Sequence, residues 1–289
     1  MAPSKITLGT RGSDLARAQT LLVEKAIRTA HPNVAIETKI ITTRGDSSKI
    51  VDLAAGRKGL FTAEIERALL ASEVDVAVHS AKDLPSQTSP GAQITAVLPR
   101  GPINDVLISK HSGGLASLPN GATVATGSVR RQRQLHWKRA DIKVVDLRGN
   151  VPTRLRKLAA NEWDAIVLAR AGLQRLGFSP TQTEIRFEGA QFYFNILPCE
   201  IFVPAGGQGI IALQIRAADQ STKAVLESVN DPETLLCLHA EREFLSRLNG
   251  DCNFPVGVHA TISNGKMKLR AQMFEGESPT SRQAEVEGE

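Results

Sequence analysis

Short apolar runs of β-strand character alternate with amphipathic helical segments along most of this chain, and this alternation limits the fold more than any other feature. Residues 5–10, 34–43 and 74–78 have the composition and period of strands. Residues 15–26 and 60–70 carry their apolar side chains at helical spacing. Strands that alternate with helices at this spacing predict an α/β domain with a mainly parallel sheet and right-handed crossovers.

The same pattern starts again after a stretch at 99–102 that contains proline and glycine. It predicts strands at 122–125, 142–147 and 165–169, with helices at 128–139 and 152–160 between them. A second α/β unit therefore follows the first.

The last part of the chain has a different character. The proline- and glycine-rich stretch up to 209 and the apolar run at 210–213 predict a linker and a strand that returns to the first domain. A helix over 222–248 and strands over 256–273, with a turn at Asn264 and Gly265, predict a small α+β domain. The polar residues 275–289 have no periodicity, and we expect them to be disordered.

These patterns divide the 289 residues into three predicted domains. Domain 1 comprises 1–98 and 200–216, domain 2 comprises 99–199, and domain 3 comprises 217–289.

Composition indicates a globular protein, with 42% hydrophobic and 22% charged residues. No apolar run has the length of a membrane span, and residues 1–5 lead straight into a strand-like segment, so we expect a cytoplasmic protein. The three cysteines lack the spacing of a metal site, and we expect free thiols and no metal. A net charge of +5 suits a polyanionic small molecule or nucleic acid and does not decide between them.

One acidic residue, Asp83, lies just beyond the strand at 74–78, in the sequence HSAKDLP. In open α/β sheets the carboxyl ends of the strands form the edge at which ligands bind. Asp83 is therefore a candidate for chemistry. A surface ion pair with its neighbour Lys82 is the alternative.

Arginine and hydroxyl side chains follow several predicted strands. Helix N-termini and guanidinium groups both favour carboxylates or phosphates, so these turns predict an anion site if they face one cleft. No Walker loop or G-x-G-x-x-G fingerprint accompanies them, and aromatic residues are only 4%, which weakens nucleotide and nucleic-acid hypotheses. The residues of these turns are Arg11, Ser13, Thr126, Ser128, Arg130, Arg131, Arg148, Gly149, Asn150 and Arg154.

Cys252 lies in a loop of Gly, Asp, Asn and Pro residues, where a thiol is more accessible than in a packed helix. No histidine at a diagnostic spacing accompanies it, so the residues alone support a protease-like nucleophile weakly. Cys237 has the surroundings of a core residue, and Cys199 has no evident role.

Taken together, these segments resemble the porphobilinogen deaminase family, also called the hydroxymethylbilane synthases. The similarity extends from about residue 5 to residue 257, and its motifs occur in the order of the family. The motifs are 10–13 (TRGS), 43–46 (TRGD), 58–61 (KGLF), 79–85 (HSAKDLP), 127–132 (GSVRRQ), 147–150 (LRGN) with Thr153 and Arg154, 171–173 (AGL) with 175–177 (RLG), Pro204 and Ala205 with 207–209 (GQG), and Cys252 with Pro255 and Gly257.

The resemblance implies two α/β domains similar to type II periplasmic binding proteins, hinged across a cleft, with a small α+β C-terminal domain. It implies a transferase of heme biosynthesis, acting as a monomer without nucleic-acid or membrane partners. Such an enzyme condenses four porphobilinogen molecules head to tail with loss of ammonia, giving hydroxymethylbilane. The pyrrole chain grows on a dipyrromethane cofactor bound by a thioether to the cysteine that matches Cys252.

The resemblance also implies roles for the site residues. Asp83 would stabilise the cationic pyrrole that forms when ammonia leaves. The carboxylates of the pyrroles would be bound by the residues Arg11, Ser13, Lys58, Lys82, Thr126, Ser128, Arg130, Arg131, Arg148 and Arg154. Further candidates at the site are Gln19, Phe61, Ser80, Gly149 and Asn150.

The chain departs from the family pattern in three places. Asp251 precedes Cys252 where glycine is usual, which brings a carboxylate next to the thiol. The loop before Lys58 is one residue short and lacks a lysine, so we expect Arg57 to take over part of that role. A C-terminal helix is missing, which suggests a truncated or variant third domain.

Two other classes of function remain to be compared with this one. A non-catalytic, two-lobed anion receptor or effector domain would have the same fold, because fold alone does not determine function. The combination of Asp83 and Cys252 argues against it. A nucleic-acid-binding module is suggested only by the positive net charge.

Overall fold

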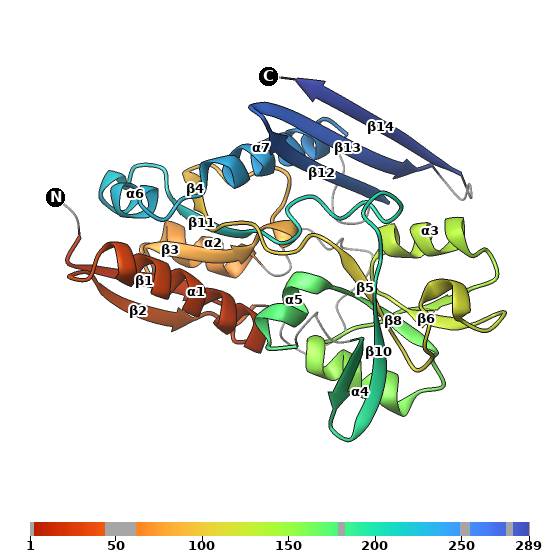
Figure 1. The fold of residues 1–289 in the computed structure, drawn as a ribbon. Helices are drawn as coiled ribbons and strands as arrows, with labels where there is room; N and C mark the ends of the chain where they lie inside the picture. Colours follow the sequence, from red (N-terminus) through yellow and green to blue (C-terminus); the bar gives the residue numbers. More distant parts are fainter. Residues whose placement is uncertain (1–2, 44–61, 179–182, 249–254, 276–279, 289) are drawn as a thin grey trace. The chain divides into compact units, whose positions relative to one another are not determined.

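The computed structural model describes residues 3–43, 62–178, 183–248, 255–275 and 280–288. The chain forms two compact units (Figure 1). One contains Met1–Gly101 and Ile210–Cys252, and the other contains Pro102–Gly209 and Asn253–Glu289. None of the described helices combines the length and the apolar character that crossing a membrane requires.

The first unit is built on a five-stranded sheet with the order β2-β1-β3-β11-β4. Strands β1 (Lys5–Thr10), β2 (Ala35–Ile40) and β3 (Val76–Ser80) are parallel, as predicted. The return of the chain to this sheet is confirmed by β11 (Ile211–Arg216), which lies between β3 and β4 (Ala92–Val97). It is antiparallel to both neighbours, so the sheet is mixed rather than mainly parallel. The reason is that β11 follows a passage through the second unit and not a helical crossover.

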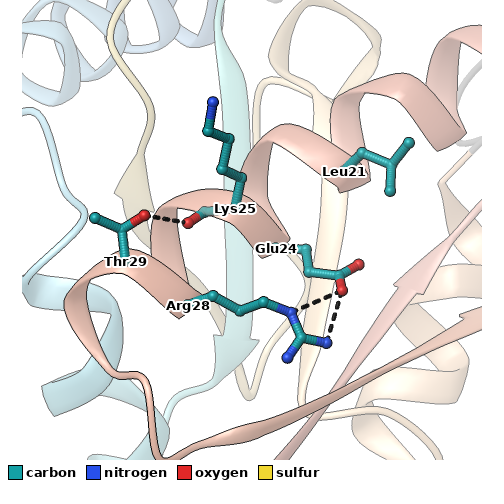
Figure 2. Close-up of a pocket in the computed structure, with 5 residues that line it drawn as sticks. All are labelled: Leu21, Glu24, Lys25, Arg28 and Thr29. Carbon is teal, nitrogen blue, oxygen red and sulfur yellow. Dashed lines mark hydrogen bonds and ion pairs between the residues drawn. The ribbon is translucent and has the colours of Figure 1, made fainter.

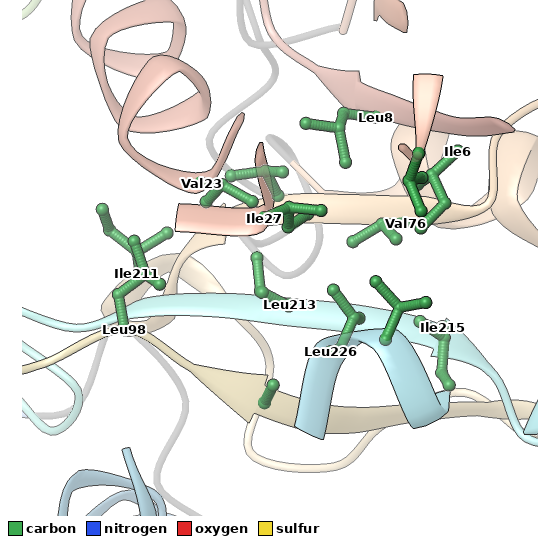
Figure 3. Packing of buried hydrophobic residues seen from close by; sticks show 14 residues of the cluster. Ile6, Leu8, Val23, Ile27, Val76, Leu98, Ile211, Leu213, Ile215 and Leu226 are labelled. Carbon is green, nitrogen blue, oxygen red and sulfur yellow. The ribbon is translucent and has the colours of Figure 1, made fainter. Parts of the chain in front are cut away.

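Two helices cover one face of this sheet with apolar side chains. Helix α1 (Asp14–Ala30) contributes Val23 and Ile27, and α6 (Gln220–Glu227) contributes Leu226. They meet the sheet around Leu213 of β11, which is completely buried (Figure 3). This cluster joins the N-terminal segment and residues beyond position 210 into one core. Helix α2 (Ala63–Leu70) belongs to a second cluster, with Ala77 of β3.

Side-chain caps determine where several helices begin. Ser13 caps α1, since its hydroxyl accepts a hydrogen bond from the Ala16 amide. The single helix predicted over 222–248 is wrong. The chain there forms α6 and a separate helix, α7 (Pro232–Arg247), because Asp231 caps α7 and Pro232 occupies its first turn, where it cannot continue a preceding helix.

The second unit contains a six-stranded mixed sheet with the order β7-β6-β8-β5-β10-β9. The predicted strands β6 (Thr123–Ala125), β7 (Lys143–Val145) and β8 (Ala165–Ala169) are parallel neighbours. The predicted helices are α3 (Val129–Lys138) and α4 (Val151–Ala160), and a short helix, α5 (Arg170–Arg175), follows β8. Antiparallel strands complete the sheet: β5 (Asp105–Ser109), β9 (Glu184–Phe187) and β10 (Ala190–Ile196).

A three-stranded antiparallel sheet also belongs to the second unit. The predicted turn at Asn264 and Gly265 joins β12 (Val256–Ser263) to β13 (Lys266–Phe274). The expectation of a disordered tail is wrong for the described residues, because β14 (Ser281–Gly288) pairs with β13 along its whole length. Backbone hydrogen bonds and a cross-strand ion pair of Glu285 with Arg270 hold this polar edge strand without an apolar pattern. The predicted three-domain boundaries remain a prediction.

The core of the first unit gives a test of this packing. We predict that Leu213→Ala lowers the free energy of unfolding by about 2–5 kcal/mol, because a large side chain is lost from a fully buried site. Urea unfolding followed by circular dichroism measures the change. The control is Leu22→Ala on the exposed face of α1, for which we expect a change within about 0.5 kcal/mol. Equal losses in both variants would contradict this description of the core.

Candidate active site

Asp83 lies at the end of a single 3-10 turn, η3 (Ala81–Asp83), which directly follows β3. The amide of Ala81 donates to the carbonyl of Ile210 at 3.0 Å, and the amide of Leu84 donates to the carbonyl of Ala81 at 3.2 Å. Ala81 and Leu84 are buried, whereas Lys82 and Asp83 between them are half-buried. The turn is therefore anchored on both sides and leaves the carboxylate of Asp83 accessible at the carboxyl end of the sheet.

The turn between β1 and α1 is tied to the same sheet edge. Gln19 of α1 is buried, and its Nε2 lies 2.9 Å from the Ser80 hydroxyl at the end of β3. Because β1 and β3 are parallel neighbours, their carboxyl ends meet. The predicted residues that gather at this edge of the first unit are Arg11, Ser13, Gln19, Ser80, Lys82 and Asp83.

A buried histidine lies on the other face of β3, one residue before Ser80. His79 Nε2 is 3.2 Å from Gln214 Oε1, and Gln214 Nε2 donates to Glu66 at 2.6 Å. Burial lowers the pKa of His79 to about 4, although the bond to Gln214 and the carboxylates of Glu66 and Asp83 oppose this shift. His79 is therefore neutral near pH 7 and acts as a buried donor rather than as a charge.

In the second unit, a tight turn connects β6 to α3. Ser128 caps α3 by accepting a hydrogen bond from the Arg131 amide, and the Ser128 amide itself lies 3.3 Å from the Thr126 hydroxyl. Gly127 between them has no space for a side chain, since a Cβ there would lie 2.7 Å from the carbonyl oxygen of Leu147. The turn after β6 therefore lies directly against the beginning of the loop after β7.

Arg130 and Arg131 in the first turn of α3 are both buried and share one carboxylate. The NH2 groups of Arg130 and Arg131 lie 2.8 Å and 2.7 Å from the two oxygens of Asp105, which is completely buried. Gln208 Nε2 donates to the same carboxylate at 2.9 Å. Burial alone would raise the pKa of Asp105, but the two guanidinium groups hold it below its usual range.

The N–H groups of Arg130 and Arg131 that do not contact Asp105 indicate which kind of ligand the two arginines can bind. The NH1 group of Arg131 donates to the Val167 carbonyl, and that of Arg130 donates to Gln134 Oε1 and to the Val203 carbonyl. The Nε atoms of both arginines are buried and have no hydrogen-bond partner among the described residues. Two guanidinium groups and one carboxylate carry one net positive charge. A buried set of this kind suits an anionic group with carboxylate oxygens.

The loop between β7 and α4 carries the other predicted arginines. Asn150 caps α4 by accepting from the Thr153 amide, and Gly149 has a φ of 115° that favours glycine. Arg148 is exposed and donates to Asp146 at 2.7 Å, and Arg154 donates to the Gly149 carbonyl at 2.7 Å. These residues lie at the same sheet edge as Thr126 and Ser128, because β6 and β7 are parallel neighbours.

Three predicted site residues, Lys58, Phe61 and Cys252, lie outside the described residues. In the described part of the chain, no group of three or more His, Cys, Asp and Glu side chains could hold a metal ion.

Comparison with known families matches two parts of the chain in order. Residues 6–224 match the family described as porphobilinogen deaminase, dipyromethane cofactor binding domain, and residues 235–289 match the porphobilinogen deaminase C-terminal domain. The chain belongs to the porphobilinogen deaminase family. The members of this family are transferases of tetrapyrrole biosynthesis.

Individual relatives agree with this assignment. The porphobilinogen deaminase of Roseiflexus castenholzii is 44% identical over 269 residues, which are 92% of this chain and 84% of the relative. That of Nitrobacter winogradskyi is 45% identical over 269 residues, 91% of this chain and 81% of the relative. Among solved structures, the methionine binding protein MetQ has a TM-score of 0.45 at 12% identity, over 81% of this chain and 93% of its own.

The residues of the second unit fit the cofactor of the porphobilinogen deaminase family. A dipyrromethane carries acetate and propionate groups, and such carboxylates need several N–H donors when they leave water. The buried Nε–H groups of Arg130 and Arg131 have no partner among the described residues and supply donors of this kind. The fit therefore rests on donor chemistry and on the net positive charge of the Asp105 cluster.

Two further arginines at this edge were not predicted as site residues. Arg170 and Arg175 belong to α5, which follows β8, the parallel neighbour of β6. Arg175 donates to the Gly209 carbonyl at 2.6 Å, and burial lowers its pKa to about 10. The Nε atom of Arg170 is buried without a partner among the described residues. The signal was present, because both follow a predicted strand as Arg130 and Arg148 do.

A surface hollow of about 370 Å³ lies away from these strand ends. It is lined by residues of the second half of α1, including Leu21, Lys25 and Thr29 (Figure 2). Its two remaining side chains, Glu24 and Arg28, form an ion pair within the helix at 2.8 Å. None of the predicted site residues lines this hollow, and we assign it no part in the site.

The buried histidine predicts a pH dependence of stability. Between its unfolded pKa of 6.5 and its folded value of about 4, the unfolded chain binds a proton that the folded chain does not. The contribution of neutral His79 to the free energy of unfolding is therefore fully present above pH 6.5 and is lost as the pH decreases. We expect wild type to lose about 2 kcal/mol more than His79→Gln between about pH 7 and about pH 5.

Urea unfolding at the two pH values measures this difference. His31→Gln, at a half-buried position just after α1, is the control and should behave as wild type. An equal pH dependence in wild type and His79→Gln would contradict a neutral, buried His79.

Proposed function

We propose that this protein condenses four porphobilinogen molecules head to tail, with release of one ammonia at each condensation, and then releases hydroxymethylbilane. The observation that carries the proposal is the match of residues 6–224 and 235–289 to the two porphobilinogen deaminase models in order. The clustering of acid and basic side chains at the strand ends supports it.

Asp83 has the chemistry that the condensation requires. When ammonia leaves the aminomethyl group of porphobilinogen, the positive charge of the remaining cation is shared with the pyrrole nitrogen. The carboxylate of Asp83 stabilises that cation and accepts hydrogen bonds from pyrrole N–H groups. The anchored turn supports this role of Asp83, because it fixes the backbone of Asp83 between the two buried residues Ala81 and Leu84.

The basic side chains bind the carboxylates of the pyrroles. Each pyrrole carries an acetate and a propionate, so the growing chain accumulates negative charge. Guanidinium groups suit these groups because they can donate two parallel hydrogen bonds. In the first unit this role falls to Arg11, Ser13, Lys58 and Lys82, and in the second unit to Thr126, Ser128, Arg130, Arg131, Arg148 and Arg154. We extend the set to Arg170, which directly follows β8, and to Arg175 at the end of the same short helix.

A dipyrromethane bound to Cys252 by a thioether supplies the free pyrrole position on which the chain is extended. Arg130 and Arg131 bind carboxylates of this primer and of the incoming porphobilinogen, with their spare Nε–H groups as donors. Gln19 and Ser80 keep the turns after β1 and β3 together, so that Arg11 and Asp83 face the same ligand. For Phe61, Gly149 and Asn150 a part in the site remains a prediction.

A non-catalytic anion receptor is not favoured. Only the fold class supports a receptor. Both matching families and the similar proteins are named as an enzyme, porphobilinogen deaminase. We further propose a cytoplasmic monomer that needs neither nucleic acid nor a membrane, because its substrate is a small molecule.

Substitution of the proposed catalytic carboxylate tests the mechanism. We predict that Asp83→Asn lowers ammonia release from porphobilinogen at least about 100-fold, because the cation loses its counter-charge. The unfolding midpoint should stay near that of wild type, since Asp83 is half-buried and at the end of a turn. The control is Asp141→Asn, a surface acid paired with Arg139. Near-normal ammonia release by Asp83→Asn would overturn the assignment.

Mass spectrometry of the intact protein tests the cofactor. We expect wild type and the control Cys199→Ser to carry the added mass of a dipyrromethane, and Cys252→Ser to lack it. A wild-type mass equal to that of the bare chain would argue for the receptor alternative. The same added mass in Cys252→Ser would place the attachment elsewhere.

A further inference from the structure

A pair of buried amides connects the arginines of α3 to the C-terminal sheet within the second unit. Gln134 of α3 and Gln272 of β13 are both completely buried. Gln134 Nε2 donates to Gln272 Oε1 at 2.7 Å and to the Val203 carbonyl at 2.9 Å, and Gln134 Oε1 accepts from Arg130 NH1 at 2.8 Å. A continuous buried path of hydrogen bonds thus runs from Asp105 through Arg130 and Gln134 to Gln272.

These contacts determine which way the Gln134 amide faces. Both of its N–H bonds are used, one by Val203 and one by Gln272, and its oxygen meets the guanidinium of Arg130. If the amide were reversed, its NH2 group would meet the N–H of Arg130 and two donors would face each other. The acceptor on Gln272 therefore helps to keep the Gln134 oxygen directed at Arg130.

The backbone around Gln272 is held at the same point. Its partner in β12 is Gly257, where a Cβ would lie 2.4 Å from the Val203 carbonyl oxygen. The Val258 amide donates to the Pro204 carbonyl at 2.9 Å. The Val203 carbonyl also accepts from Arg130 and Gln134. Strand β12, segment 203–204 and helix α3 consequently meet around one carbonyl group.

If packing were its only role, an apolar side chain would be more favourable than glutamine at position 272. Its Nε2 is buried and has no hydrogen-bond partner among the described residues. A buried donor without a partner lowers stability, whereas an apolar side chain of the same volume carries no such penalty. This penalty, together with the path to Arg130, separates Gln272 from an ordinary core residue.

We propose that Gln272 is a positioning residue for carboxylate binding. It acts through Gln134 to hold the Arg130 guanidinium in the orientation that leaves its Nε–H for the anionic ligand. The inference rests on the proposed function, and it adds a residue of the C-terminal sheet to the arginine site. Hydrogen bonds thus connect the strands that follow Cys252 in the sequence to the arginine site.

A double-mutant cycle measured by equilibrium binding tests the proposal. The probe is porphobilinogen, titrated calorimetrically into proteins that all carry Asp83→Asn, so that binding is measured without turnover. We expect Gln272→Met and Gln134→Met each to raise the Kd about tenfold, because each releases the Arg130 guanidinium. The double variant should also be about tenfold weaker, and not about a hundredfold, because both residues act on the same group.

The matched control is Gln283→Met, which changes the exposed glutamine paired with Gln272 on β14. It should leave the Kd unchanged. The unfolding midpoint of Gln272→Met should stay near that of wild type, because the variant removes one buried donor without a partner but also leaves one N–H of Gln134 without its acceptor. A loss of affinity in Gln272→Met therefore cannot be attributed to a weakened fold.

The outcomes separate the two proposals. If porphobilinogen binds the Asp83→Asn parent but the Kd is unchanged in Gln272→Met, the positioning role is wrong and the proposed function stands. An additive, hundredfold loss in the double variant would also overturn the role, since Gln272 would then act independently of Gln134. If porphobilinogen binds neither the parent nor wild type, the proposed function itself fails.

Discussion

The second unit depends on one buried carboxylate. Asp105 has no exposure to solvent and lies between two guanidinium groups that are themselves buried. Removing either partner from such a cluster leaves a charge without compensation, which is far more unfavourable than losing an ordinary hydrogen bond. Helix α3, strand β5 and the Gln208 segment are consequently held together by charge rather than by apolar contact alone. The same arrangement keeps two arginines rigid before any ligand binds.

A second organising feature is the parallel pairing of neighbouring strands. In the first unit it brings the ends of β1 and β3 together, and in the second it does the same for β6, β7 and β8. Residues that are more than sixty positions apart, such as Gln19 and Ser80, become direct neighbours in this way. Short rigid turns then hold the polar side chains, so that little ordering remains to be paid for when an anion binds.

Much of this could be predicted from the sequence because the signals are local. The Ser13 cap, the strand before Asp83 and the helix that begins after Ser128 all follow from residue type and spacing. The pairing of β14 could not be predicted, since cross-strand partners and not its own pattern stabilise it. The sequence also could not reveal that Arg130 and Arg131 share Asp105, because about 25 residues separate them from their partner and no local rule connects them. The position of Gln272 depends on the fold in the same way.

The place of β11 in the first sheet affects how the chain can fold during synthesis. This strand lies between β3 and β4, yet it is made only after the whole of the 102–209 segment. Until then the sheet lacks an interior strand, and β3 and β4 expose hydrogen-bonding edges on a ribosome-bound chain. The intervening segment carries its own six-stranded sheet, so the later-made unit can complete its large sheet first. Of the two large sheets, the one that contains the N-terminal strand is thus the later to be completed.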